Sequence, residues 1–260
     1  MELCWYGNAT INISTAKTSF ITDPFITRNP DLPPLRVEDV KKAKHILVGH
    51  GHFDHIADIP DFVKQVPIPI YTTERVGNML INNWGVDKDL IRAVKPGDSF
   101  EVEDAKLTVY SAKHVKFDLP LIASTAATIL KPPYKDKFKM LKKNLMDHKK
   151  CPMCDCIAWQ IEYDNKKLLH FSSLALEKNE NYPTDSDMLC LPFQGHSRLD
   201  KIGEGVVQQI PTKSVFIHHY DNAFPPISRH VDTQPFSDLM KTTHPEVKII
   251  LPKYRQVVEL

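Results

Sequence analysis

The 260-residue chain lacks any long hydrophobic run, although 42% of its residues are hydrophobic. No window approaches the roughly 18 consecutive apolar residues that a membrane-spanning helix requires. Residues 1–11 also lack the basic stretch followed by an apolar core that is typical of a secretory signal. We therefore expect a cytoplasmic protein that does not use a membrane as partner.

An excess of charge of one sign is missing as well. Thirty-three Lys and Arg residues stand against 32 Asp and Glu residues, and the formal net charge is +1. A balance of this kind provides no long-range attraction toward nucleic acids or anionic membrane surfaces. Nucleic acid is therefore not expected as the main partner, and charge can act only locally.

The number and spacing of the cysteines also do not suggest a disulfide framework. The chain has five cysteines, an odd number, and three of them lie within residues 151–156. Secreted disulfide-rich domains carry paired cysteines spread along a short chain. Reduced thiols or metal ligands therefore explain these cysteines better than disulfides do.

Neither an internal repeat nor a low-complexity linker divides the chain, and its length suffices for one layered core. We predict a single domain over residues 1–260. Strands are expected at LCWY, TINIS, SFITD, 45–49, 68–71, IRAVK, SFEVE, KLTVYSA, CIAWQIEY, KKLLHFS, DMLCLPF, SVFIHH and VKIILP, and helices at 36–44, 58–65, 72–83, 198–210 and 235–243. The order predicts an α/β fold with four layers, an αββα sandwich.

The strongest local signal is a cluster of potential metal ligands directly after the apolar strand at 45–49. The cluster reads GHGHFDH and contains His50, His52, Asp54 and His55. In a loop that leaves a strand these side chains can converge on one point, and the two glycines permit the backbone turns. Imidazole and carboxylate ligands suit Zn²⁺, and Mn²⁺ or Fe are alternatives. The sequence therefore predicts a site for one or two ions.

This motif, H-x-H-x-D-H after a β-strand, resembles the hallmark of the metallo-β-lactamase superfamily, and the resemblance covers nearly the whole chain. The opening CWYGNATINI followed by FITDPF is similar to the start of the branch related to L-ascorbate-6-phosphate lactonase. The resemblance implies a metallo-β-lactamase fold and a metal-dependent hydrolase. Asn8 stands where many relatives have histidine. Asp23 resembles a carboxylate that buttresses the metal loop, although a simple Asp-Pro turn is the alternative.

The resemblance also implies the remaining ligands. His114 matches a histidine that follows a strand, and His219 matches the last histidine of the pattern. His218 is the neighbouring alternative, because adjacent strand residues point to opposite faces. The first site would then consist of His50, His52 and His114, and the second of Asp54, His55 and His219. Tyr220 and Asp221 are candidates for holding the His219 ring.

The pattern breaks at the end of the strand that reads LLHFSSLAL. Relatives carry there an aspartate that bridges two metal ions, and this position falls on Ser173 or its neighbour Ser172. Neither hydroxyl is an anion. Two divalent ions about 3.5–4 Å apart repel by on the order of 20 kcal/mol at an effective dielectric of 20. A mononuclear or unequal site is therefore expected.

A cysteine-rich segment offers a substitute for the missing carboxylate. A hairpin turn at 165–166 would pair Asp164 with Lys167 and set Cys156 opposite Ala175, at the same end of the sheet as the missing aspartate. We hypothesise that thiolates of this segment bind metal, in the active site or in a small zinc knuckle, while redox chemistry and unliganded thiols remain alternatives. The candidate ligands are His148, Cys151, Cys154 and Cys156.

A basic segment precedes these cysteines, and together they form an insertion at about 131–156. Residues 131–150 contain eight lysines and two aspartates, and Phe138, Leu141 and Leu145 recur at helical spacing. An amphipathic helix is predicted. It would form a lid whose lysines attract an anionic substrate, or simply a solvated basic face. Nucleic-acid binding is a weaker alternative, because no basic-aromatic surface accompanies the lysines.

The predicted chemistry follows from the histidine cluster. A metal held there would lower the pKa of bound water from 15.7 toward about 7. Asp54 would orient the nucleophile or take up its proton, and His196, in the loop after DMLCLPF, would bind substrate or donate a proton unless it only caps the next helix. We predict a zinc-dependent hydrolase of a small anionic ester, lactone or phosphodiester. The alternatives are a degenerate metal-binding or redox module and a nuclease, and a homo-oligomer is left open.

Overall fold

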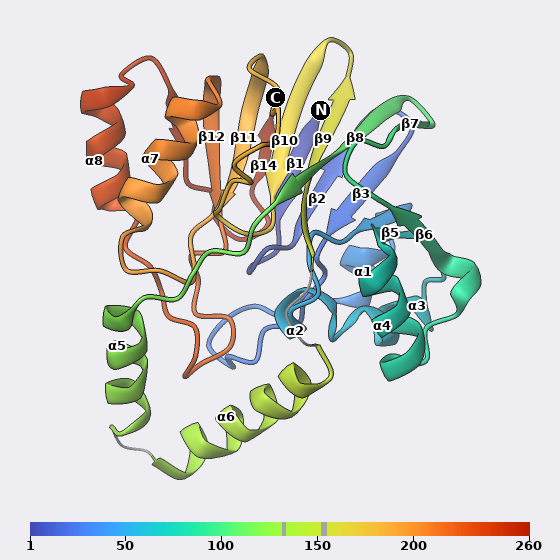
Figure 1. The fold of residues 1–260 in the computed structure, drawn as a ribbon. Coiled ribbons are helices and arrows are strands. Elements are labelled where there is room, and N and C mark those ends of the chain that lie inside the picture. Colours follow the sequence, from blue (N-terminus) through green and yellow to red (C-terminus); the bar gives the residue numbers. More distant parts are fainter. Residues whose placement is uncertain (132–133, 152–154) are drawn as a thin grey trace.

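The structure is a computed structural model that describes residues 1–131, 134–151 and 155–260 (Figure 1). Two seven-stranded sheets form its centre. The first sheet contains β1 (Glu2–Trp5), β2 (Ile11–Ser14), β3 (Ser19–Thr22), β4 (His45–Leu47), β5 (Ile70–Thr73), β6 (Ile91–Val94) and β14 (Val257–Glu259), in the order β14-β1-β2-β3-β4-β5-β6. The second contains β7 (Ser99–Val102), β8 (Ala105–Ala112), β9 (Cys156–Tyr163), β10 (Lys166–Phe171), β11 (Ser186–Pro192), β12 (Thr212–His218) and β13 (Lys248–Ile250), in the order β13-β12-β11-β10-β9-β8-β7.

Helices cover the outer face of each sheet, which gives the four layers that the sequence predicts (Figure 1). Helices α1 (Val37–Val40), α3 (Ile59–Val63) and α4 (Glu74–Trp84) pack on the first sheet, and α7 (Leu199–Gln209) and α8 (Gln234–Thr243) pack on the second. Between the sheets, Trp5, Phe20 and Trp159 are fully buried in one apolar cluster. The predicted αββα sandwich is confirmed.

The buried strands owe their place to continuous apolar sequence. Every residue of β11 is buried, and β11 pairs in parallel with β10 on one side and β12 on the other. Parallel strands covered on both faces need such unbroken apolar runs. Because β3 and β4 are also parallel, and β8 runs antiparallel to β9 as β9 does to β10, the loops that follow β3, β4, β8, β10 and β12 leave at one edge of the sandwich. This edge carries the histidine cluster.

The predicted register of the β9–β10 hairpin is wrong by two residues. The turn consists of Asp164 and Asn165, with φ of 50° and 58°, and Tyr163 pairs with Lys166. A two-residue turn of this kind requires left-handed backbone at both positions, which Asp and Asn tolerate better than Lys. Ala158 therefore pairs with Phe171, and Cys156 pairs with Ala112 of β8 instead of lying opposite Ala175.

Three further helices lie near the edge that carries the histidine cluster, and a 3-10 helix, η1 (Lys88–Leu90), precedes β6. Helix α2 (Phe53–Ile56) lies inside the histidine motif, and α6 (Tyr134–Lys149) is the predicted amphipathic helix. Helix α5 (Leu119–Ile129) was not expected; its first turn contains a proline, and the Asp118 side chain accepts a hydrogen bond from Leu121 N. Figure 1 shows α5 and α6 beyond the edge of the sheets at which α2 lies.

None of the helices in the described part of the chain combines the length and the apolarity that crossing a bilayer requires. This agrees with the absence of a long apolar run in the sequence. The cytoplasmic location stays a prediction.

Candidate metal centre

The loop after β4 carries the first four candidate ligands into the edge between the sheets. Gly49 permits this path: a Cβ added there would lie 1.8 Å from Ser172 Oγ and 2.3 Å from Ser172 Cβ. Only a residue without a side chain can bring the loop so close to the end of β10. His52 then starts α2 with extended backbone, which places Asp54 and His55 on one short helical turn.

The structure brings all six predicted metal ligands together in two groups. Within each group, one candidate ligand atom of every residue lies within 4.8 Å of the others. The groups are His50, His52 and His114, and Asp54, His55 and His219. The two groups adjoin, because the ring centroids of His50 and His55 are 3.9 Å apart. Six side chains from three segments of the chain thus form two adjoining groups. Five of them are buried, and His114 is half-buried.

Of the two neighbouring histidines at the end of β12, His219 belongs to the cluster. Its Nε2 lies 3.3 Å from Asp54 Oδ2, and its backbone N–H donates to Asn8 O over 2.8 Å. His218 points the other way: its Nε2 is 3.1 Å from Phe171 O. The alternative assignment of His218 as a ligand is therefore excluded by its position.

Asp23 holds the histidine loop from below. Its Oδ1 accepts a hydrogen bond from Gly49 N over 2.9 Å, and its Oδ2 lies 3.0 Å from His55 Nδ1. The Ser172 hydroxyl donates to the same Oδ2. Because Nδ1 of His55 is engaged with Asp23, Nε2 is left to face Asp54 at 3.3 Å. This geometry is that of the predicted buttressing carboxylate.

Asn8 links the first loop to the cluster. Its side-chain amide donates to Asp54 O over 2.6 Å, and its backbone N–H donates to both carboxylate oxygens of Asp221. Asp221 therefore acts on His219 indirectly, through the Asn8 backbone. The Tyr220 hydroxyl donates to Pro252 O, and His219 Nδ1 has no hydrogen-bond partner among the described residues. Of the two predicted supports of His219, Asp221 is thus connected to it through Asn8, whereas Tyr220 makes no hydrogen bond to the His219 ring within the described residues.

Burial and neighbouring charges set the protonation of the cluster. Burial, reinforced by the other histidines, lowers the pKa of His52 to about 3 and holds the pKa values of His50 and His114 below the usual range. Burial also opposes charge on His55, but the carboxylates of Asp54 and Asp23 raise its pKa to about 10. The first group thus offers neutral imidazoles, whereas His55 must release a proton to bind a cation.

The donor set fits a divalent cation. Both ring nitrogens of His50 are buried and accept no hydrogen bond from the described residues. Burying an unpaired polar atom is unfavourable, and coordination of a cation by one of these nitrogens would remove that penalty. Three histidines in one group, and one carboxylate with two histidines in the other, are ligand sets that suit zinc and related metals.

The two serines at the end of β10 line the cavity that also contains both groups. Ser173 Oγ accepts a hydrogen bond from Val115 N over 3.0 Å, while Ser172 is engaged with Asp23. Both line the cavity above the cluster, and Asp54 is the one carboxylate among the described lining residues. No second anion is therefore offered between the two groups by these side chains, as the sequence indicates.

The predicted cysteine ligands are only partly placed by the structure. Cys154 lies outside the described residues, and Cys151 and Cys156 are buried. His148 lines the cavity, with its ring centroid 5.9 Å from that of His52. Within the described ranges, neither of the two candidate metal groups includes a cysteine. His148 is thus brought to the site, whereas Cys156 lines a different hollow.

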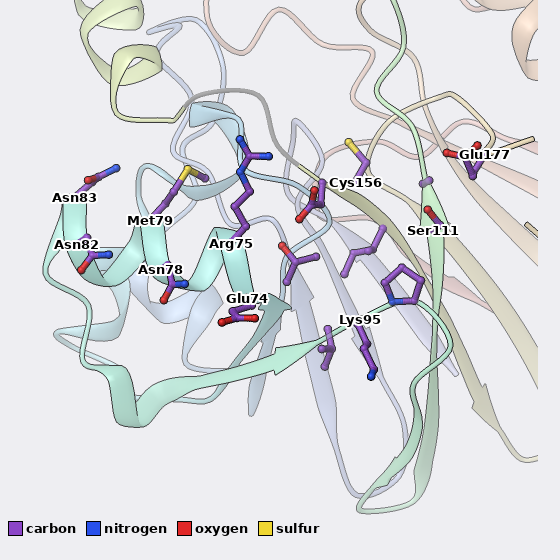
Figure 2. A pocket seen from close by; sticks show the side chains of 16 residues that line it. Glu74, Arg75, Asn78, Met79, Asn82, Asn83, Lys95, Ser111, Cys156 and Glu177 are labelled. Atoms are coloured by element: carbon purple, nitrogen blue, oxygen red, sulfur yellow. The ribbon is translucent and has the colours of Figure 1, made fainter.

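This second hollow, of about 870 Å³, lies beside α4. Figure 2 shows Glu74, Arg75 and Asn78 of α4 on one side of it and Cys156 and Glu177 on the other. Its lining mixes acidic, basic and amide side chains and contains none of the six clustered ligands. The chemistry of the cluster therefore belongs to the other cavity.

The cavity above the cluster measures about 450 Å³. All six clustered side chains lie in its wall, together with residues of α5, α6 and the loops after β10, β11 and β12. Gln194 and Gly195 line it, but their neighbour His196 is not among the lining residues. Instead, His196 Nδ1 accepts a hydrogen bond from Arg198 N over 2.9 Å, next to the start of α7. The predicted catalytic role of His196 finds no support in this position.

Comparisons with known proteins agree with this architecture. The family model described as Beta-lactamase superfamily domain matches residues 18–128. A UPF0173 metal-dependent hydrolase from Ruegeria sp. is 31% identical over 118 residues, which cover 44% of this chain and 49% of the relative. The chain thus matches about half the length of this curated relative.

Solved structures match over nearly the whole chain. Igni18, a metallo hydrolase from Ignicoccus hospitalis, is 16% identical with a TM-score of 0.65, covering 99% of this chain and 97% of its own. The metallo-β-lactamase fold protein YhfI from Bacillus subtilis is 12% identical with a TM-score of 0.60, covering 99% of both chains. The chain has the metallo-β-lactamase fold, and its match to the β-lactamase superfamily model is confined to residues 18–128.

Proposed function

We propose that this protein is a metal-dependent hydrolase whose metal is held by the six clustered side chains. One observation carries the proposal: two groups of three ligands, buried and adjoining, lie in the wall of a cavity large enough for a small substrate. A divalent cation held there would lower the pKa of a bound water toward about 7 and so supply a nucleophile at neutral pH. The matched relative is itself called a metal-dependent hydrolase.

The side chains of the cluster are proposed to have three roles: binding the metal, orienting the attacking water and orienting a ligand. His50, His52 and His114 are neutral imidazoles and form the stronger site, since they bind a cation without losing a proton. Asp54 faces His55 and His219 at 3.3 Å and orients the attacking water or takes up its proton. Asp23 holds His55 in the orientation that this arrangement requires.

Zinc is the proposed metal, with Mn²⁺ and Fe as alternatives, because the donors are imidazole nitrogens and one carboxylate. The two positions are proposed to be unequal. Ser173 supplies no charge between them, and the second group must give up the His55 proton before it binds a cation. The first position fills at lower metal concentration.

The proposed substrates are esters, lactones or phosphodiesters. The resemblance of the first 25 residues to the L-ascorbate-6-phosphate lactonase branch supports a lactone, and the predicted negative charge on the substrate stays a prediction. A degenerate metal-binding or redox module would share the histidine cluster but show no turnover. A nuclease would use the exposed lysines of α6, such as Lys142 and Lys143.

Metal removal and reloading test the proposal. Protein treated with a chelator should lose hydrolysis of p-nitrophenyl acetate, a lactone and bis-p-nitrophenyl phosphate, and Zn²⁺, Mn²⁺ or Fe²⁺ should restore it for at least one of them. The His114→Ala variant should lose at least 100-fold in kcat/KM and bind less metal, because one of three ligands of the stronger site is gone. The His230→Ala variant is the control, since His230 is exposed and outside the cluster. Full metal loading without turnover of any substrate would contradict the proposal.

A further inference from the structure

The cavity wall that faces the cluster of candidate metal ligands is apolar, and residues of α5 form much of it. Residues Leu121, Ile122, Thr125, Ala126 and Ile129 line the cavity. Their spacing puts them on one face of the helix. Helix α5 has no charged residue along its whole length, LPLIASTAATI. A helix without charge thus covers a site whose opposite side consists of histidines and a carboxylate.

Further apolar side chains close the same space. Phe117 precedes α5, Leu145 projects from α6, and Phe224 and Ile227 come from the loop after β12. The ring of Phe117 lies 5.4 Å from the ring of His114. The apolar wall therefore begins directly beside a predicted metal ligand.

The α6 lysines whose side chains are described do not line this wall. None of the described lysines lines the cavity, whereas Leu145 and His148 do. Lys142, Lys143 and Lys149 are exposed on the remainder of the helix. A second negative charge on a bound substrate would therefore find no ammonium group among the described lining residues.

The apolar wall is also incompletely covered. Ile122 is 53% exposed, Phe117 is 55% exposed and Leu145 is 47% exposed, although all three border the cavity. Large apolar side chains exposed together beside a polar site are typical of ligand-binding surfaces. A hydrocarbon group seated between α5 and α6 would remove these side chains from water.

We propose that the cavity takes an ester or lactone of a carboxylic acid with an uncharged hydrocarbon chain, and that α5 with Leu145 selects this chain. The inference rests on the proposed hydrolase. The carbonyl carbon of the substrate would lie at the cluster of candidate metal ligands, and its hydrocarbon chain would lie along α5. Water oxygen bonds to the carbonyl carbon, the bond from that carbon to the alcohol oxygen breaks, and one proton of the water passes to the leaving oxygen. An ester yields the acid and the alcohol, and a lactone yields one hydroxy acid.

Binding of the product acids measures the selection without any turnover. Butanoate, hexanoate, octanoate and octanedioate are titrated calorimetrically into the zinc-loaded protein. Each added methylene should tighten binding about fourfold, because burying a methylene contributes on the order of 0.8 kcal/mol and a tenfold change corresponds to about 1.36 kcal/mol. Octanedioate should bind at least tenfold more weakly than octanoate. Equal affinities along the series, or tighter binding of octanedioate, would overturn the proposal.

Paired variants locate the selection on the lining face. Ile122→Gln and Leu145→Gln change exposed lining residues, and Leu119→Gln and Met146→Gln change residues that are 80% and 59% exposed on the same helices but outside the lining. The first pair should weaken octanoate binding about tenfold and flatten the chain-length series, while the second pair should change it less than twofold. Equal effects of the two pairs would contradict the assignment.

Turnover of the p-nitrophenyl esters of the same acids distinguishes the apolar selection from the hydrolase activity. Hydrolysis that is independent of chain length, with flat binding, would refute the apolar selection and leave the hydrolase intact. Steep binding without hydrolysis of any ester, lactone or phosphodiester would confirm the apolar site and refute the hydrolase. Both should rise together with chain length.

Discussion

At the scale of single residues, Asp23 organises more of the site than its position outside the cavity suggests. It engages Gly49 N, His55 Nδ1 and the Ser172 hydroxyl at once. The Asp23→Asn variant cannot hold His55 by charge, and we expect metal affinity at the second group to fall 10- to 100-fold, as with other residues that orient ligands. Competition with a chromophoric chelator measures this. The Asp31→Asn variant, changed at an exposed loop position, should match the unmodified protein.

Ser173 is the residue at which the missing anion can be restored. Ser173 lines the cavity that contains both groups, and its hydroxyl accepts a hydrogen bond from Val115 N, which a carboxylate can also do. The Ser173→Asp variant should bind a second ion at least tenfold more tightly, because a carboxylate between two cations offsets part of their repulsion. Titration with zinc measures the two affinities. Ser173→Asn has nearly the same shape without the charge, and an equal gain in both variants would contradict the electrostatic explanation.

His170 makes the stability of the fold depend on pH. Burial lowers its pKa to about 4, whereas an unfolded histidine titrates near 6.5. Between these values the unfolded chain binds more protons, so the contribution of a neutral His170 is fully present above about pH 6.5 and is lost as the pH falls toward 4.

The His170→Gln variant cannot titrate, and the pH dependence of its free energy of unfolding should be weaker by up to about 3 kcal/mol across this window. Urea unfolding of chelator-treated protein between pH 4 and 7 measures the difference. His230→Gln, at an exposed position, serves as control. An unchanged slope in the His170 variant would show that this histidine does not titrate as described.

At the scale of the elements, the β9–β10 hairpin depends on its two turn residues. Asn165 has a φ of 58°, a left-handed conformation that costs most residues about 1–2 kcal/mol. Asn165→Ala should lower the free energy of unfolding by about 1 kcal/mol, whereas Asn165→Gly should leave it unchanged or raise it slightly. Thermal unfolding distinguishes the two. The Asn82→Ala variant, on helix α4, lacks this penalty, and equal destabilisation by both alanines would contradict the explanation.

The elements that were predicted correctly and those that were missed differ in where their stability comes from. Strands such as β11 carry their burial as an unbroken apolar run, which the sequence alone displays. Helix α5 has apolar and small residues all around and no charged face, so periodicity does not reveal it; its Asp118 cap and the proline in its first turn are the signals that were available. The hairpin register depended on a choice between two adjacent turns, which backbone conformation decides.

The site divides in the same way. The histidine cluster was predictable because four of its ligands lie in one short motif, and His114 and His219 follow strands that end at the same edge. The sequence leaves two roles open for His196, because a loop histidine near a cavity and one that receives a hydrogen bond at the start of a helix look alike in sequence, and its position favours the second. The apolar wall could not be predicted from the sequence. Its residues come from α5, α6 and the loop after β12, and they lie together only in the folded chain.

At the scale of the whole molecule, the stacking of two sheets gathers the functional loops. The carboxyl ends of β3, β4, β8, β10 and β12 lie at one edge, so ligands far apart in the chain converge without distorting either sheet. Helices α5 and α6 then cover this edge, and α6 contacts α2 inside the histidine motif. The fold thus brings the candidate ligands together, and we propose that α5 and α6 select the substrate.

The proposed hydrolase requires that the imidazoles and the Asp54 carboxylate bind a common cation site. Anomalous diffraction at the zinc edge, from crystals of the zinc-loaded protein, tests it most directly. We expect a strong peak about 2.0–2.1 Å from one nitrogen of each of His50, His52 and His114, and a weaker peak near Asp54, His55 and His219. A map with no peak among these side chains, at a zinc concentration that saturates other sites, would contradict it.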